Sequence, residues 1–210
     1  MKIIITGGNG SLGKNLCKEF KGEIHVLDKE KPKQKLNHVK YHEVDITSKK
    51  VISVLKKIGE VDLVINNAGV MRRGKITEIS EEDFDFCIDV NFKGSWLVSR
   101  YAKLKKTGIL LFINSRHGEK IKNEPSIYSL SKVALKYLAL LFKNQHIIVK
   151  EAYLGPFIGG VSKTGYSDSE YALRKKDKAE TMAKLIRKLV EGKETKLMFN
   201  EKTQEYYFKK

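Results

Sequence analysis

The strongest constraint on the fold is a glycine-rich turn between an apolar strand and an amphipathic helix at the start of the chain. The β-branched stretch from Lys2 to Thr6 predicts a buried strand, and Gly8-Asn-Gly10-Ser-Leu-Gly13 follows it directly. A helix is expected from about Ser11 to Phe20. Backbone N–H groups in this setting can approach a pyrophosphate at the helix N-terminus. The turn therefore predicts a dinucleotide site, and both flanking elements argue against a glycine-rich turn without a ligand.

Predicted strands and helices alternate along the rest of the chain. Six further strands are expected at Glu23–Leu27, Val39–Val44, Val61–Ile65, Gly108–Asn114, Ile147–Tyr153 and Lys196–Phe199. Long helices are expected from Ser80 to about Lys103 and around Tyr128, whereas Lys29 to His38 is predicted to be a loop. This alternation is typical of the α/β class, with a single doubly wound parallel sheet of about seven strands and helices on both faces. The tail from Glu201 to Lys210 alternates in part and is expected to cover a sheet edge or a partner.

The length of 210 residues favours a single domain over residues 1–210. Within it, the polar and glycine-containing stretch 157–178 is expected to be a loop that covers the substrate. No apolar run is long enough to span a bilayer, and the one near the N-terminus is too short for a signal peptide. Cys17 and Cys87 are expected to be buried thiols in a reducing compartment, and no Cys/His cluster has metal-ligand spacing. A cytoplasmic protein without a metal site is therefore predicted.

The formal net charge of +16 raises the question of an anionic partner, such as nucleic acid, a membrane surface or an acidic protein. The lysines are spread along the whole chain and stand beside acidic residues, as in Asp28-Lys-Glu-Lys. A nucleic-acid reader more often concentrates its basic residues in one element together with stacking aromatics. A lysine-rich solvated surface, with no nucleic acid and no membrane as partner, is therefore favoured.

Asp28 ends the second predicted strand, 20 residues beyond Gly8. A carboxylate at this place accepts hydrogen bonds from the adenosine ribose hydroxyls of NAD and repels the 2′-phosphate of NADP. Four lysines follow it and could compensate such a phosphate: Lys29, Lys31, Lys33 and Lys35. NAD is therefore favoured as the cofactor over NADP.

A second chemical centre is predicted between Ser115 and Lys132. Tyr128 and Lys132 are four residues apart, which stacks them on one helix face. A lysine ammonium beside a phenol favours the phenolate, so the pKa of Tyr128 is expected to fall below its reference of about 10. Tyr128 is then a candidate general acid or base. Ser115 ends an apolar run and is expected at the carboxyl end of the sheet, where sites of such sheets lie. The alternative is an ordinary lysine–tyrosine pair on a helix surface.

With these features together, the chain resembles the short-chain dehydrogenase/reductase (SDR) family over nearly its full length. Thr6-Gly7-Gly8-Asn9-Gly10-Ser11-Leu12-Gly13 resembles the family's cofactor loop, and Asn66-Asn67-Ala68-Gly69 matches its N-N-A-G motif. Asn91, Ser115, Tyr128 and Lys132 match its catalytic tetrad. The resemblance implies a Rossmann-like sheet in the order 3-2-1-4-5-6-7 and an NAD(P)-dependent oxidoreductase. Such an enzyme interconverts a secondary alcohol and a carbonyl by hydride transfer.

The resemblance also implies a role for each matched residue. Tyr128 is expected to exchange a proton with the substrate oxygen, Ser115 to hold that oxygen, Lys132 to bind the nicotinamide ribose and Asn91 to hold a water in a proton relay. The implied cofactor-binding residues are Thr6, Gly7, Gly8, Asn9, Gly10, Ser11, Leu12, Gly13, Asp28, Asp45, Ile46, Asn67, Ala68, Gly69, Tyr128, Lys132, Pro156, Phe157 and Ile158. Family members commonly form dimers or tetramers, so a homodimer or homotetramer is expected.

Some positions leave alternatives open. Gly155-Pro156 reverses the family's usual Pro-Gly order, and Ser11 stands where shorter members usually have glycine. Asn91, in the middle of a predicted helix, could instead face solvent. The alternative function is a non-catalytic dinucleotide-sensing or regulatory protein on the same fold. The intact tetrad favours an enzyme, because a sensor needs the glycine loop but not the tetrad. Four basic residues could bind a substrate carboxylate or phosphate, or could be rim charges: Arg72, Arg73, Arg116 and His117.

Overall fold

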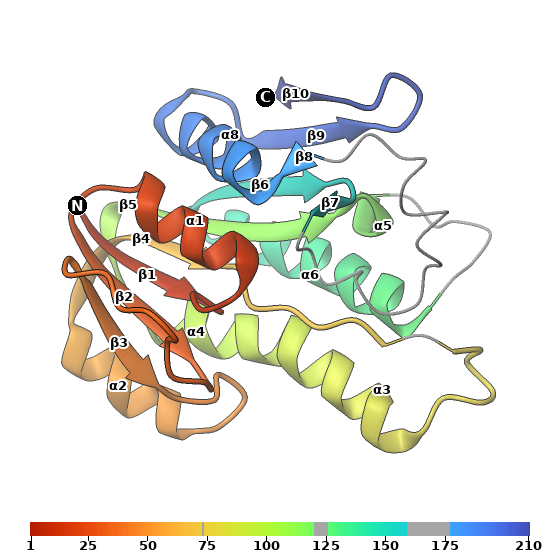
Figure 1. The fold of residues 1–210 in the computed structure, drawn as a ribbon, viewed down its shortest axis with the longest axis horizontal. Helices are drawn as coiled ribbons and strands as arrows, with labels where there is room; N and C mark the ends of the chain where they lie inside the picture. The colour runs from red at the N-terminus through yellow and green to blue at the C-terminus, as the bar shows by residue number, and fades with distance from the viewer. Residues whose placement is uncertain (73, 120–125, 159–176) are drawn as a thin grey trace.

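The computed structural model describes residues 1–72, 74–119, 126–158 and 177–210. These residues form a central eight-stranded sheet in the order β10-β9-β6-β5-β4-β1-β2-β3 (Figure 1). The ladders between neighbours are parallel except for β10, which runs antiparallel to β9. The strands are β1 (Lys2–Thr6), β2 (Glu23–Asp28), β3 (Val39–Glu43), β4 (Glu60–Asn66), β5 (Lys103–Ser115), β6 (Ile148–Leu154), β9 (Lys196–Asn200) and β10 (Glu205–Lys209). The predicted doubly wound sheet and its strand order are confirmed, with one strand more than expected.

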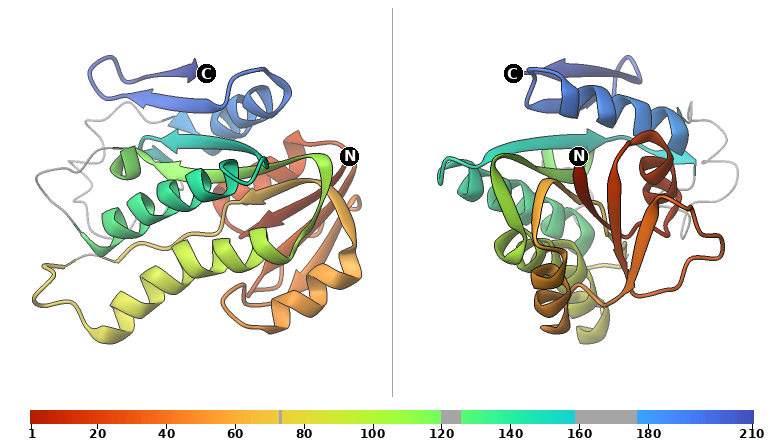
Figure 2. Two further views of the ribbon diagram at one scale, coloured as in Figure 1. Left: turned by 180° about the vertical axis from the view of Figure 1, so that it is seen from behind. Right: turned by 90° about the vertical axis from the view of Figure 1, so that its left-hand side faces the viewer.

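The apolar strand residues alternate between two helical layers, as the period of a strand requires. In β1, Ile3 and Ile5 face one layer and Ile4 faces the other. Helices α1 (Ser11–Glu19) and α8 (Ala179–Glu191) pack on the first face. The second face is covered by α2 (Lys50–Ile58), α4 (Ser95–Tyr101) and α6 (Ile127–Lys143) (Figure 2). The remaining helical segments of the described residues are α3 (Glu81–Ile88), the π-helical turn η1 (Asp89–Gly94) and the short α5 (Arg116–Glu119).

The loop predicted between β2 and β3 is confirmed, since no helix forms from Lys29 to His38. The helical segment expected from Ser80 to about Lys103 ends at Tyr101, and the strand expected from Gly108 begins already at Lys103. Cross-strand pairing explains the difference. Lys103 pairs in register with Glu60 of β4, and the Lys105 ammonium lies 2.7 Å from the Asp62 carboxylate. These contacts draw a lysine-rich segment into the sheet.

The C-terminal tail covers the sheet edge, which is one of the two roles predicted for it. β9 and β10 form a hairpin, and the partly buried Tyr206 and Phe208 pack on the same layer as α1 and α8. A second, two-stranded sheet pairs β7 (Phe157–Ile158) with β8 (Asp177–Lys178). The rest of the segment predicted to cover the substrate, residues 159–176, lies outside the described residues.

Cys17 in α1 and Cys87 in α3 are buried free thiols, as predicted. Within the described part of the chain, no helix combines the length and apolarity needed to cross a membrane. The same residues contain no cluster of three or more histidine, cysteine or acidic side chains arranged to hold a metal ion.

Candidate active site

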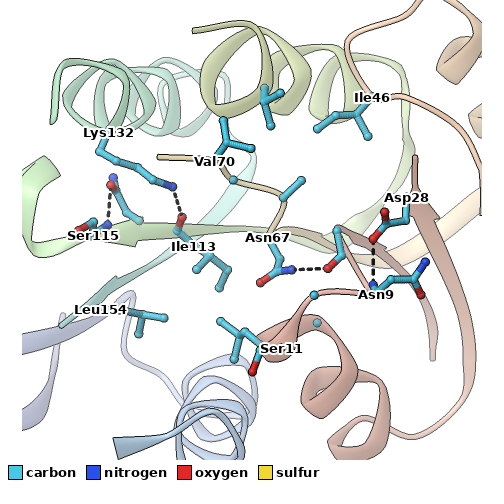
Figure 3. A pocket seen from close by; sticks show the side chains of 18 of the residues that line it. Asn9, Ser11, Asp28, Ile46, Asn67, Val70, Ile113, Ser115, Lys132 and Leu154 are labelled. Atoms are coloured by element: carbon cyan, nitrogen blue, oxygen red, sulfur yellow. Dashed lines mark hydrogen bonds between the residues drawn. The ribbon is translucent and has the colours of Figure 1, made fainter. Parts of the chain in front are cut away.

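A cavity of about 430 Å³ opens at the carboxyl ends of the central strands (Figure 3). The turn after β1 and the end of β2 form one part of its wall, and the end of β5 and α6 form another. A crevice at this place is where doubly wound sheets bind ligands, because strand order reverses there. The cavity therefore joins the two centres that were predicted separately from the sequence.

The glycine turn is shaped by close backbone packing. Gly7 has a φ of +63°, which favours glycine, and a Cβ on Gly13 would lie 2.3 Å from the Gly7 carbonyl oxygen. Helix α1 begins after Gly10 and has no acidic residue in its first turn. The N–H groups of the first helical turn and the positive dipole end can thus interact with an anion at the cavity wall.

Asp28 lines the cavity at the end of β2, as predicted. Its Oδ2 accepts a hydrogen bond from Asn9 N at 2.9 Å (Figure 3), and its Oδ1 accepts one from Glu30 N at 3.1 Å. The carboxylate therefore fixes the glycine turn from the side. Each of its oxygens retains acceptor capacity, since a carboxylate oxygen can accept more than one hydrogen bond.

Thr6 and Asn67 join the end of β1 to the turn after β4. Thr6 Oγ1 accepts hydrogen bonds from Asn67 N at 3.0 Å and Ala68 N at 2.9 Å. In return, Asn67 Nδ2 donates to the carbonyl oxygens of Thr6 at 2.9 Å and Gly7 at 3.0 Å. These four bonds hold Ala68 and Gly69 at the cavity wall.

Asn91 is buried in the π-helical turn η1, so the solvent-facing alternative is excluded. Its Oδ1 accepts from Val70 N at 2.8 Å, and its Nδ2 donates to Val70 O and to Ser131 Oγ, both at 2.9 Å. The side chain therefore clamps the chain that follows Gly69. The expected role in holding a water stays a prediction.

Ser115, Tyr128 and Lys132 meet at the other end of the cavity. Ser115 is the last residue of β5, while Tyr128 and Lys132 lie on α6, and all three line the cavity. The Lys132 ammonium is 5.8 Å from the centroid of the Tyr128 ring and donates to Ile113 O at 3.0 Å (Figure 3). The surface-pair alternative is therefore wrong, because both side chains are buried.

The expected fall in the pKa of Tyr128 was also wrong. Burial raises the pKa of the Tyr128 phenol to about 12, and a hydrogen bond with Ser115 opposes this in part. Burial lowers the pKa of the Lys132 ammonium to about 8. Proximity to the lysine was predicted correctly from the spacing, but burial of the phenol raises its pKa.

Most of the predicted site residues meet at this cavity. The lining residues among them are Gly7, Asn9, Gly10, Ser11, Leu12, Gly13, Asp28, Asp45, Ile46, Asn67, Ala68, Gly69, Ser115, Tyr128, Lys132, Pro156 and Phe157. Three others, Thr6, Gly8 and Asn91, are buried behind the wall. Ile158 belongs to β7 and pairs with Lys178.

The basic residues predicted near the site contact neighbouring side chains. Arg72 pairs with Asp83 and stacks over Phe86, with its Cζ 4.6 Å from the ring centroid. Arg116 pairs with Glu201 at 2.7 Å and lines the cavity together with His117. Arg73 lies outside the described residues.

Several wall residues were not predicted from the sequence. Phe86 of α3 lies at the cavity, and the ammonium of Lys29, one of the lysines predicted to compensate a 2′-phosphate, is 5.5 Å from its ring centroid. Val44 and Val90 also line it, each next to a residue that was predicted. Val44 and Val90 could have been predicted from their neighbours in the sequence, Asp45 and Asn91. No sequence feature marked Phe86 as a wall residue.

The residues present fit a nicotinamide dinucleotide. The wall has close backbone packing at the glycine turn, a carboxylate at the end of β2, and a Ser/Tyr/Lys cluster farther along. Fold and site together define a dinucleotide-binding α/β domain. The sequence model of the short chain dehydrogenase family matches residues 1–156. The chain belongs to this family.

Relatives and solved structures agree with this membership. An uncharacterized oxidoreductase of Thermotoga maritima is 31% identical over 152 residues, covering 63% of this chain and 61% of the relative. The sepiapterin reductase of Chlorobaculum tepidum is 34% identical over 83 residues, covering 38% of this chain and 34% of the reductase. The chain thus spans less than two thirds of the length of these curated relatives.

Two solved structures show the same fold with a nucleotide bound. A short chain dehydrogenase from Burkholderia cenocepacia in complex with NADP has a TM-score of 0.80 at 20% identity, covering 93% of this chain and 86% of that one. One from Leptospira borgpetersenii with bound NAD+ has a TM-score of 0.72 at 25% identity, covering 90% and 84%. The two differ in the nucleotide that they hold.

Proposed function

We propose that the protein is an NAD(P)-dependent oxidoreductase that interconverts an alcohol and a carbonyl, with Tyr128 as general acid and base. The observation that carries this proposal is the joining of two centres in one cavity. The glycine turn and Asp28 lie at one part of the wall, and Ser115, Tyr128 and Lys132 lie at another. A sensor would need the first centre alone.

The residues proposed to hold the nucleotide follow from their chemistry. The N-terminus of α1 would bind the pyrophosphate, Asp28 the adenosine ribose hydroxyls, and Asp45 with Ile46 the adenine ring. NAD is proposed over NADP because the Asp28 carboxylate repels a 2′-phosphate. The stacking of Lys29 on Phe86 supports this choice, since it turns the nearest lysine toward the ring.

The reaction proposed here divides between the nucleotide and the protein. A bound nicotinamide would supply or accept the hydride. In the reducing direction, Tyr128 donates its hydroxyl proton to the carbonyl oxygen, and Ser115 holds that oxygen by a hydrogen bond. With a pKa of about 12, the phenol is protonated at neutral pH and ready to donate. Lys132 would bind the nicotinamide ribose.

The test is a comparison of Tyr128→Phe with Tyr137→Phe. Tyr137 lies on the same helix and is 63% exposed, so it controls for loss of a tyrosine hydroxyl on α6. NADH consumption with a panel of carbonyl compounds should fall at least 100-fold in Tyr128→Phe, the low end of a general acid's contribution, and stay unchanged in Tyr137→Phe. NADH binding should persist in both variants. Equal inactivity of the wild type and Tyr128→Phe across the panel, with binding intact, would favour the dinucleotide-sensing alternative.

The proposal includes self-association as a homodimer or homotetramer. Exposed apolar side chains on two helices support it: Trp96 and Tyr101 on α4, and Tyr137, Leu140 and Leu141 on α6. Tyr137, Leu140 and Leu141 are three and four positions apart and share one face of α6, and an exposed apolar face is typical of an interaction surface. Light scattering coupled to size exclusion would give the mass, and a monomer at micromolar concentration would contradict this part of the proposal.

A further inference from the structure

The hairpin of β9 and β10 contacts the catalytic end of the cavity at two places that strand pairing does not explain. Its ladder with β6 consists of Glu151 with Lys196 and Ala152 with Leu197. Beyond these two residue pairs, the hairpin also contacts the residues that follow the ends of β5 and β6.

The first contact is made by Tyr206 of β10. Its hydroxyl oxygen accepts a hydrogen bond from Gly155 N at 3.0 Å. Gly155 follows Leu154, the last residue of β6, and both line the cavity. The cross-strand partner of Tyr206 is Phe199, and their ring centroids are 5.0 Å apart. A Cβ on Gly155 would lie 2.7 Å from the Phe199 ring, so this ring occupies the space beside the glycine.

The second contact is made by Glu201, in the turn of the hairpin. Its carboxylate accepts a hydrogen bond from Arg116 at 2.7 Å. Arg116 follows Ser115 directly, and its side chain is 16% exposed at the cavity wall. A partly desolvated ion pair of this kind restrains both side chains more than an exposed pair does.

The two contacts lie next to the same pair of register partners in the sheet. Ser115 and Leu154 are register partners at the end of the β5–β6 ladder. The residue after each of them is held by the hairpin, one through Glu201 and the other through Tyr206. The hairpin therefore ties together the ends of the two strands that bring Ser115 and Gly155 to the cavity.

We propose that Tyr206 and Glu201 are positioning residues that set the nicotinamide end of the cofactor pocket from outside it. This inference rests on the proposed function, because it needs a nucleotide in the cavity. It assigns the hairpin a role in the site in addition to covering the sheet edge.

The test compares Tyr206→Phe with Tyr207→Phe. Both changes remove one hydroxyl from β10, but Tyr207 is 45% exposed and its side chain points to the opposite side of the strand. Binding of NADH and of ADP-ribose is measured for each variant and the wild type. ADP-ribose shares the adenosine, the pyrophosphate and the second ribose of NADH but lacks the nicotinamide ring, so it does not fill the part of the pocket that the hairpin sets.

Tyr206→Phe should weaken NADH binding about three- to tenfold, the typical effect of one lost hydrogen bond, and leave ADP-ribose binding unchanged. The fluorescence of bound NADH, which reports the surroundings of the nicotinamide, should also change. Tyr207→Phe should match the wild type in all three measurements. Glu201→Gln, which removes the negative charge that Arg116 contacts at 2.7 Å, should repeat the selective loss, with exposed Glu205→Gln as its control.

Wild-type NADH affinity in both Tyr206→Phe and Glu201→Gln would overturn the inference and leave the proposed function intact. An equal loss of NADH and ADP-ribose binding in these variants would also overturn it, because it would indicate a general loss of structure. If the wild type bound neither nucleotide, the proposed function and the inference would both be wrong.

Discussion

Asn91 and Val70 are joined by a pair of hydrogen bonds, in which the Asn91 amide binds both the N–H and the carbonyl of Val70. Asn91 lies in a π-helical turn and is 0% exposed, and Val70 lines the cavity. Such turns occur frequently at functional sites, where the extra residue redirects a side chain. The pair fixes the chain segment that leads away from Asn67, Ala68 and Gly69.

The first prediction concerns this pair. Asn91→Ala removes the Asn91 hydrogen bonds to the N–H and the carbonyl of Val70, which should lower the free energy of unfolding by about 3 kcal/mol. Asn37→Ala, in the exposed loop after β2, should change it by less than about 0.5 kcal/mol. Urea denaturation measures both. Similar values for the two variants would mean that the clamp does not stabilise the fold.

The second prediction concerns Thr6, whose hydroxyl accepts from two backbone N–H groups of the turn after β4. Thr6→Val keeps the shape but removes both acceptor bonds, so it should cost about 2 kcal/mol of stability. Thr6→Ser keeps the hydroxyl and should cost less. Thermal unfolding of the two variants compares them, and a valine variant as stable as the serine variant would contradict the assignment.

The third prediction concerns the choice of nucleotide. Asp28→Asn keeps an oxygen that can accept from Asn9 N but removes the charge that would repel a 2′-phosphate. The ratio of NADPH to NADH affinity should rise at least about tenfold, or about 1.4 kcal/mol. Glu43→Gln is the matched control, because Glu43 is the register partner of Asp28 on β3 and carries the same charge. An equal rise in both variants would indicate a general effect of net charge.

The fourth prediction concerns Lys132, whose pKa burial lowers from 10.5 to about 8. Between these values the unfolded chain binds more protons than the folded one, so the free energy of unfolding should rise with pH. Burial of the ammonium lowers the stability of the folded protein by its full amount below the pKa of Lys132 in the folded state. This loss of stability disappears above the pKa of Lys132 in the unfolded state. Relative to Lys132→Met, the wild type should gain about 2 kcal/mol from pH 7.5 to pH 9.5.

Lys143→Met serves as the control, since Lys143 ends the same helix with an exposed side chain. Its stability should follow that of the wild type across the same range. A constant difference between the wild type and Lys132→Met would show that the ammonium is not desolvated in the folded protein.

The elements with clear periodicity could be predicted from the sequence. Ile3, Ile4 and Ile5 alternate between the two layers, and the site residues at strand ends were found because strands end where apolar runs end. The lysine-rich start of β5 was missed because its polar residues carry no strand pattern. Pairing with Glu60 and Asp62 on β4, which is a tertiary effect, places it in the sheet.

The parts of the site that could not be predicted depend on contacts between distant segments. The spacing of Tyr128 and Lys132 gave their proximity but not their burial, and burial decides the direction of the Tyr128 pKa. The contacts of Tyr206 with Gly155 and of Glu201 with Arg116 join residues that are 51 and 85 positions apart. No local pattern marks such pairs.

The central claim is that this cavity binds a nicotinamide dinucleotide with NAD preferred. Titration of the wild-type protein with NADH and with NADPH, followed by fluorescence, tests it most directly. The account predicts saturable binding of NADH at one site per chain, tighter than the binding of NADPH. The absence of saturable binding by either nucleotide would contradict it.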